Sequence, residues 1–140
     1  MASLVFNSAV RDIVTGAIDL DTDTFWAMLT TSAYTENKDT HTKRSDVTNE
    51  VAATGGYTAG GQAITVSVAA VDTANDRVVV TFNAVSWPAS TITARKMVVY
   101  KRRGGAATAD ELVFVNDFGS DVVSVNGTLT VNASTVTFQN

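Results

Sequence analysis

The sequence predicts a mainly β protein: an antiparallel two-sheet β-sandwich or jelly roll of about eight strands, with one short N-terminal helix. The composition favours strands, because 21 valines and 21 threonines stand among the 140 residues and both side chains are β-branched. Short segments with apolar residues at alternate positions follow one another, separated by polar turns. Only one segment, near the N-terminus, shows helical spacing, so the pattern does not fit repeated strand–helix–strand units.

Length and charge limit the possible functions. The chain suits a single domain over residues 1–140, since a chain of this size buries roughly two thirds of the surface that it exposes when unfolded. Its net charge of −4 argues against a general nucleic-acid binder, which needs a basic face. No apolar run approaches about 18 residues, so no membrane partner is expected. With no cysteine and one histidine, the usual zinc sites are excluded, and no metal or other cofactor is expected.

The expected helix covers about residues 4–15. Apolar residues recur there at intervals of four and form one stripe along a helix. Ser3 is a candidate cap at its start, and Gly16 can end it in the left-handed conformation. The stripe has to pack on a neighbouring element, and one face of a sheet is the natural candidate. Its members are Val5, Phe6, Ala9, Val10, Ile13 and Val14.

The strands are expected from residue 24 onward. Aromatic and apolar residues over 24–30 predict a buried strand, and alternation over 64–68 and 77–84 predicts two half-buried strands. Pro88 is expected to end the last of these, because proline cannot donate a hydrogen bond to the ladder. Imperfect alternation over 92–101 indicates a bulge or burial on both faces. Further short strands are expected at 112–115, 120–125, 129–131 and 136–138.

Three segments are poor candidates for a core. Residues 36–46 contain no apolar side chain and predict a long exposed excursion, with a helical turn near 44–49. Residues 55–61 contain two glycine pairs around a tyrosine and predict a flexible turn. The densest basic cluster of the chain opens a loop over 101–105. Its members are Lys101, Arg102 and Arg103.

The sequence offers no credible enzyme site. His41 lies in the polar excursion, and we expect a solvated loop histidine there. Asp19, Asp21 and Asp23 alternate as in a calcium-binding loop, but threonines stand where that loop needs its glycine and its last glutamate. An acidic turn is therefore expected at these positions. The adjacent acids at 110–111 would point to opposite faces of a strand, so they would not act together.

Six runs of the sequence carry a resemblance to a known family. They include Asn7-Ser8-Ala9-Val10-Arg11-Asp12-Ile13-Val14-Thr15-Gly16, and the others are residues 19–25, 34–41, 56–61, 91–95 and 98–101. Taken in order, they extend over nearly the whole chain. The chain resembles the cement, or decoration, proteins on HK97-like capsids of tailed bacteriophages, and in particular the jelly-roll cement proteins of short-tailed phages.

The resemblance implies a place and partners for the chain. It implies a β-sandwich made in the cytoplasm of the host bacterium and bound in the virion to the outer surface of the capsid. The major capsid protein is then the partner, and the chain is a dimer at two-fold positions between capsomers. A symmetric homodimer would most simply form through a sheet edge, although the pattern of residues does not identify the edge strand.

Loops are the expected contact surface, because loops on a rigid sandwich often carry recognition. The arginines are expected to face acidic groups of the capsid, whereas a solvated basic loop is the alternative. The candidates for capsid contact are Lys101, Arg102, Arg103, Tyr57, Lys43 and Arg44.

Two other functions stay open at this point. One is a tail or head-completion component of the same kind of virion. The other is a carbohydrate-binding β-sandwich for attachment to a host, in which Trp87 and Tyr57 would stack against sugars. Trp26 lies in an apolar run and is expected in the core.

Overall fold

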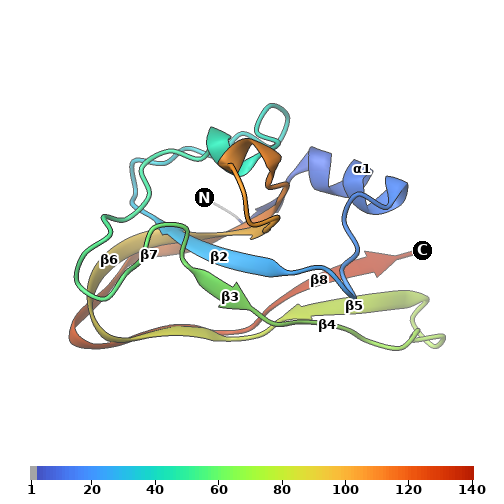
Figure 1. Ribbon diagram of the computed structural model, residues 1–140. Helices are drawn as coiled ribbons and strands as arrows, with labels where there is room; N and C mark the ends of the chain where they lie inside the picture. Colours follow the sequence, from blue (N-terminus) through green and yellow to red (C-terminus); the bar gives the residue numbers. More distant parts are fainter. Residues whose placement is uncertain (1–2) are drawn as a thin grey trace.

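The computed structural model of the protein describes residues 3–140. Within these residues, eight strands form two antiparallel sheets beside one α-helix (Figure 1), which confirms the predicted fold class. The elements are β1 (Leu4–Val5), α1 (Asn7–Thr15), β2 (Phe25–Thr30), β3 (Gln62–Ile64), β4 (Val66–Val68), β5 (Arg77–Phe82), β6 (Val85–Lys101), β7 (Leu112–Val131) and β8 (Ser134–Gln139), with short 3-10 helices at Arg44–Asp46 and Ala107–Ala109. The five-stranded sheet has the order β1-β7-β6-β2-β3, and the three-stranded sheet has the order β4-β5-β8.

A long antiparallel ribbon connects the two sheets. β5 continues into β6 and β7 continues into β8, and the pairs Phe82–Ser134 and Val85–Val131 keep the same register across the junction. The sequence predicts separate strands at 112–115, 120–125 and 129–131. This division is wrong, because all three segments lie within the single strand β7. Figure 1 shows the ribbon curving from one layer into the other.

Pro88 does not end a strand, contrary to expectation, since it lies inside β6. The register with β7 shifts between Trp87 and Ser90, and Ala89 has a φ of 49°. A bulge of this kind leaves residues out of the ladder and so accommodates a proline. The Ser90 hydroxyl donates to the Trp87 carbonyl at 2.8 Å and lies 2.8 Å from the Ser124 hydroxyl, so side chains supply hydrogen bonds inside the bulge.

The single strand expected over 64–68 is also wrong. β3 pairs with β2 in the larger sheet, whereas β4 pairs with β5 in the smaller one. The chain passes between the sheets at Thr65, whose carbonyl accepts a hydrogen bond from the Asn83 amide at 2.9 Å. The alternation of apolar residues is the same on both sides of this crossing, which is why the sequence pattern does not reveal it.

The helix begins later than expected. Residues 4–5 form β1 against β7, and α1 starts at Asn7. Ser3 is not its cap, because the Ser3 hydroxyl donates to the Asn116 side chain at 3.2 Å. Gly16 ends the helix with a φ of 82°, as predicted. The apolar stripe is narrower than expected, since Val10 is 49 % and Val14 is 81 % exposed.

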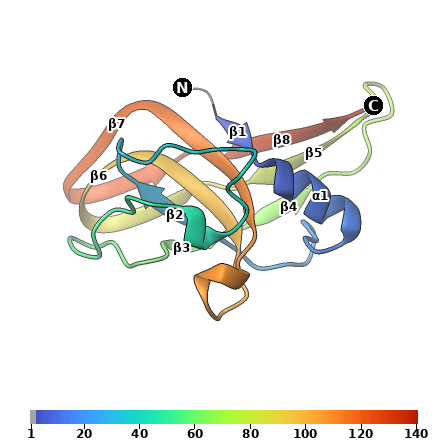
Figure 2. The ribbon, with the colours of Figure 1, turned by 90° about the horizontal axis from the view of Figure 1, so that it is seen from above.

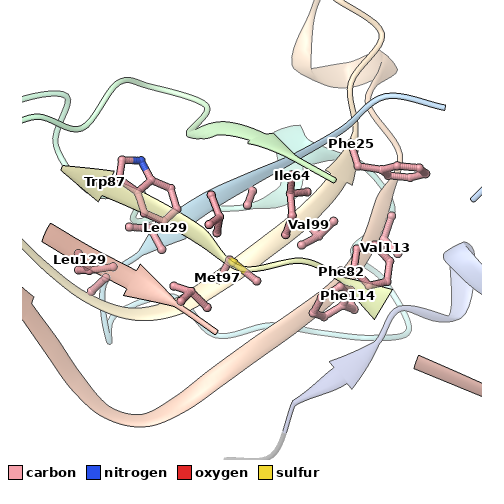
Figure 3. Packing of buried hydrophobic residues seen from close by; sticks show 14 of the residues in the cluster. Phe25, Leu29, Ile64, Phe82, Trp87, Met97, Val99, Val113, Phe114 and Leu129 are labelled. Atoms are coloured by element: carbon pink, nitrogen blue, oxygen red, sulfur yellow. The ribbon is translucent and has the colours of Figure 1, made fainter. Parts of the chain in front are cut away.

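The main core lies between the two sheets (Figure 3). Phe82 from the smaller sheet meets Phe114 from the larger one with ring centroids 4.7 Å apart, and Phe25 meets Phe82 edge-on at 6.3 Å. Such edge-to-face contacts add to the free energy gained by burying the rings. The predicted buried strand is confirmed as β2, of which only Trp26 is not fully buried.

A second apolar cluster covers the opposite face of the five-stranded sheet. It lies under α1 and the loops, so that side chains of β6 are buried on both faces. Burial on both faces, together with a register shift between Ala94 and Lys96, explains the imperfect alternation over 92–101. The cluster consists of Phe6, Ala9, Met28, Tyr34, Val98, Tyr100, Leu112 and Val115.

Candidate functional site

Residues 36–46 and 101–111 lie over the outer face of the five-stranded sheet, and residues 55–61 run along its edge beside β2 and β3 (Figure 1). The carbonyl of Thr42 accepts from the Leu112 amide at 3.1 Å, and Lys43 forms an isolated β-bridge with Glu111. The Tyr100 hydroxyl donates to the Gly60 carbonyl at 2.6 Å. We call residues 36–46, 55–61 and 101–111 together the loop face.

Arg103 is paired within the loop face. Its Nε donates to Glu111 Oε1 at 2.7 Å, and its Nη2 donates to Glu111 Oε2 at 2.6 Å. Lys43 Nζ lies 3.8 Å from the same carboxylate, which is 5 % exposed. The hydrogen bonds from Arg103 hold the pKa of Glu111 below its ordinary value. Arg103 therefore braces its own loop and does not present a free carboxylate-binding edge.

Arg44 is paired in the same way with Asp110. Its Nε donates to Asp110 Oδ2 at 2.8 Å, and its guanidinium lies 5.1 Å from the centre of the Tyr100 ring. Asp110 Oδ1 accepts from the Arg103 amide at 2.9 Å, so one buried carboxylate links two loops. Burial raises the pKa of Tyr100 to about 12, and its hydroxyl remains a donor at neutral pH.

Lys101 and Arg102 have different surroundings although they are neighbours. Lys101 Nζ forms an ion pair with Asp23 Oδ2 at 2.8 Å and donates to the Ala17 carbonyl at 2.7 Å. The Arg102 guanidinium lies 3.8 Å from the centre of the Trp26 ring. Among residues 3–140, no carboxylate pairs with Arg102, and its side chain is exposed. Arg102 is thus the basic candidate whose hydrogen-bond donors stay available.

Asp110 and Glu111 are the residues of the candidate site that sequence reasoning missed. Both are buried, at 0 % and 4 % exposure, directly before β7. The two acids were expected not to act together, and their ion-pair partners were not foreseen. Each of them binds a different arginine of the loop face. The one available signal was the pair of acids a few residues after the basic cluster, at the two ends of one hairpin loop.

The turn over 55–61, which was expected to be flexible, is held by hydrogen bonds and close packing. The Tyr57 hydroxyl donates to Glu50 Oε1 at 2.7 Å and accepts from the Leu29 amide at 3.0 Å. The Gly60 amide donates to the same Glu50 oxygen at 2.5 Å. At Gly61, an added Cβ would lie 1.7 Å from the Ala27 carbonyl oxygen, so the turn is pressed against β2.

Tyr57 and Trp87 do not form an open platform. Tyr57 is 3 % exposed and Trp87 is 4 % exposed, and their ring centroids lie 6.1 Å apart in the inter-sheet core. Burial raises the pKa of the Tyr57 hydroxyl above its ordinary value. Their proposed use in stacking sugars is therefore contradicted, and Tyr57 offers no surface for a capsid contact.

The excursion over 36–46 is also less exposed than expected. Glu36 is 6 % exposed and pairs with Lys96 of β6, which is 7 % exposed. Lys96 Nζ also donates to the Tyr34 carbonyl at 2.8 Å. His41 is not a solvated loop residue, because its ring stacks on Tyr34 and its Nδ1 lies 3.0 Å from the Tyr34 hydroxyl.

The acidic turn at 19–23 is stabilised from within. Asp19 Oδ1 accepts from the Asp21 amide at 3.0 Å, and these turn contacts lower the pKa of Asp19. In the part of the chain that the structure describes, no group of three or more histidine, aspartate or glutamate side chains is arranged to hold a metal ion. No helix within residues 3–140 is long and apolar enough to span a bilayer.

Comparison with protein-family models, with curated proteins and with solved structures finds no match for this chain.

Proposed function

We propose that this chain is a capsid cement protein, which binds the outer surface of an HK97-like phage head and stabilises contacts between capsomers. The resemblance of its sequence to cement proteins suggests this role. The observation that carries the proposal is the loop face, whose loops are held together by ion pairs and can serve as the binding surface. Cations at 43, 44, 101 and 103 are paired with Asp23, Asp110 and Glu111, so the loops are ordered before any partner binds. Binding through such a surface loses little conformational entropy.

Within this proposal, Arg102 is the residue that contacts the major capsid protein. The Arg102 guanidinium lies over the Trp26 ring, and the side chain is exposed. The planar edge of the guanidinium can bond a carboxylate at two points, and stacking on the ring restricts the side chain beforehand. An acidic patch on the capsid is the partner chemistry that this arrangement fits. The cations at 43, 44, 101 and 103 then hold the loop face in shape.

The alternatives differ in their support. A tail or head-completion component could use the same face, and only the location of the chain in the virion separates it from a cement protein. The carbohydrate-binding alternative loses support, because both of its proposed stacking residues are buried.

The experiment is binding of the purified chain to phage heads that lack it, measured as occupancy per head over a salt series. Arg102→Ala is expected to lower occupancy and flatten the salt dependence, because a charged contact is lost. The matched control is Arg77→Ala, which removes the same charge from an exposed arginine at the start of β5 in the other sheet. If heads do not bind the wild-type chain, the cement role is wrong. If both variants bind equally, Arg102 is not the contact.

A further inference from the structure

Exposed apolar side chains gather at one end of the sandwich. Among residues 3–140, seven large apolar side chains are exposed, and two of them lie on β7 in the long ribbon. The other five lie on α1, on and after β4, and on β8: Val10, Val14, Val68, Val71 and Phe138. Figure 1 and Figure 2 both show α1, the turn after β4 and the end of β8 at the same end of the molecule. A contiguous exposed apolar patch often marks an interaction site.

Three hollows meet around Phe138. One of about 340 Å³ lies between α1 and β8, one of about 360 Å³ lies between the turn at residues 19–21 and the strands β4 and β5, and one of about 530 Å³ lies at the start of β5. Phe138 lines all three, and Ile13 and Leu20 line the first two. We call the three hollows together the Phe138 groove. Its apolar lining includes Val10, Ile13, Leu20, Val68, Val71 and Phe138.

The groove forms where the inner face of the smaller sheet loses its cover. Phe82 at the end of β5 packs against Phe25 and Phe114 of the larger sheet. Further back along β5, Val78 lines the groove, and α1 and the turn at 19–21 lie over the strand in place of the larger sheet. This cover is incomplete, because Phe138, the cross-strand partner of Val78, is 38 % exposed. Apolar side chains that belong to the core side of the sheet therefore remain open to a binding partner.

The charges that line the groove are mostly negative. Asp19, Asp21 and Asp76 line it, and all three are exposed. Among residues 3–140, the only cation that lines it is Arg77, which forms an ion pair with Asp72. A hydrogen bond from the Asp21 amide lowers the pKa of Asp19, so this carboxylate is ionised at neutral pH. The groove thus combines an apolar floor with an acidic rim, which is the opposite charge to the open arginine of the loop face.

We propose that the Phe138 groove binds a segment of a partner protein in which apolar side chains stand next to lysine or arginine. The apolar side chains of such a segment leave water by covering Phe138 and its neighbours, and this burial supplies the binding energy. The flanking cations then lie beside the acidic rim, which attracts them and repels acidic segments. The inference goes beyond the cement role, since the groove shares no residue with the loop face and takes a partner of opposite charge.

The first test titrates the full chain, labelled with ¹⁵N, with three synthetic peptides of equal length. One carries leucine and phenylalanine flanked by lysines, the second has glutamates in place of the lysines, and the third has serines in place of the apolar residues. The first peptide is expected to shift the amide signals of α1, residues 19–21 and the end of β8, and to bind at least about fivefold more tightly than the others at low salt. Equal binding of the three, no binding at millimolar peptide, or shifts confined to the loop face would overturn the inference.

The second test uses variants at exposed positions, and circular dichroism checks that each one folds. Asp21→Lys should weaken binding of the lysine peptide about fivefold, whereas Asp121→Lys, the same change of charge on β7, should not. Val10→Gln should weaken it as well, whereas Val125→Gln, at an exposed valine of β7, should not. Equal effects within either pair would overturn the inference. Sedimentation of the chain alone covers the other occupant: self-association that Val10→Gln abolishes would assign the groove to a second copy and would also overturn it.

Discussion

Arg103 and Glu111 form a two-point ion pair at the two ends of the loop that joins β6 to β7, with N–O distances of 2.7 and 2.6 Å. The pair closes the loop on itself, and Lys43 brings the neighbouring loop to the same carboxylate. The sequence suggests that the basic cluster at 101–103 is a free contact patch. In the structure, most of its charges are instead engaged in ion pairs within the chain. This leaves Arg102 as the cation of the cluster with no carboxylate partner among residues 3–140.

The ion pair of Arg103 and Glu111 predicts that two similar substitutions lower the free energy of unfolding by different amounts. Glu111→Ala removes a buried carboxylate with charged hydrogen bonds and should lower the free energy of unfolding by about 1.5–3 kcal/mol. Asp121→Ala removes the exposed partner of Arg95 and should cost about 0–1 kcal/mol. Urea denaturation of both variants measures the difference. Equal costs would show that the pair of Arg103 and Glu111 does not stabilise the loop.

The same pair predicts a loss of stability in acid. The folded-state pKa of Glu111 lies below its ordinary value of 4.5, because the carboxylate accepts hydrogen bonds from Arg103. Its contribution is thus fully present above pH 4.5 and is lost as the pH falls through the lowered folded-state pKa. Arg103→Gln should make the unfolding free energy less dependent on pH in this range. An unchanged pH dependence would count against the pair.

The buried pair of Glu36 and Lys96 predicts a larger effect. Glu36→Leu leaves the Lys96 ammonium buried without its carboxylate and should cost about 3–5 kcal/mol. Adding Lys96→Met should recover part of that loss, because no charge then remains buried. A double-mutant cycle in urea measures the coupling. Additive costs would contradict a direct interaction between the two side chains.

Two glycines with left-handed backbones predict different responses to alanine. At Gly61, with a φ of 79°, the new Cβ would meet the Ala27 carbonyl, so Gly61→Ala should disrupt the contact with β2 and lower the melting temperature strongly. At Gly104, with a φ of 85°, nothing lies within 4 Å, and the cost should be about 1 kcal/mol from the backbone alone. Thermal unfolding compares them, and a smaller loss at Gly61 would contradict the packed turn.

The local elements of the fold follow from the sequence because they depend on nearby residues. The ending of α1 at Gly16, the buried strand β2 and burial on both faces of β6 all follow from spacing within short windows. The length of β6 does not, because the bulge at Pro88 uses Ser124 from the opposite strand. The position of a proline in one strand does not predict which residues of the neighbouring strand will supply the hydrogen bonds that the proline cannot make.

The candidate site was predictable in place but not in detail. Residues 36–46 and 101–105 do meet over one face of the larger sheet, and residues 55–61 reach that face at Gly60, whose carbonyl accepts from the Tyr100 hydroxyl. Their burial was missed, because Glu36 finds Lys96 across 60 positions and Arg44 finds Asp110 across 66. A polar run predicts solvent exposure only when no opposite charge from elsewhere in the chain folds onto it. That information exists only once the strands are paired.

The most direct test of the cement role is a map of the decorated phage head at side-chain resolution. The chain is expected on the outside of the capsid, with its loop face turned toward the major capsid protein. Arg102 should lie within hydrogen-bond distance of a capsid carboxylate, and Arg103 should remain on Glu111. A chain located in the tail, or one whose loop face points to solvent while another surface contacts the capsid, would contradict it.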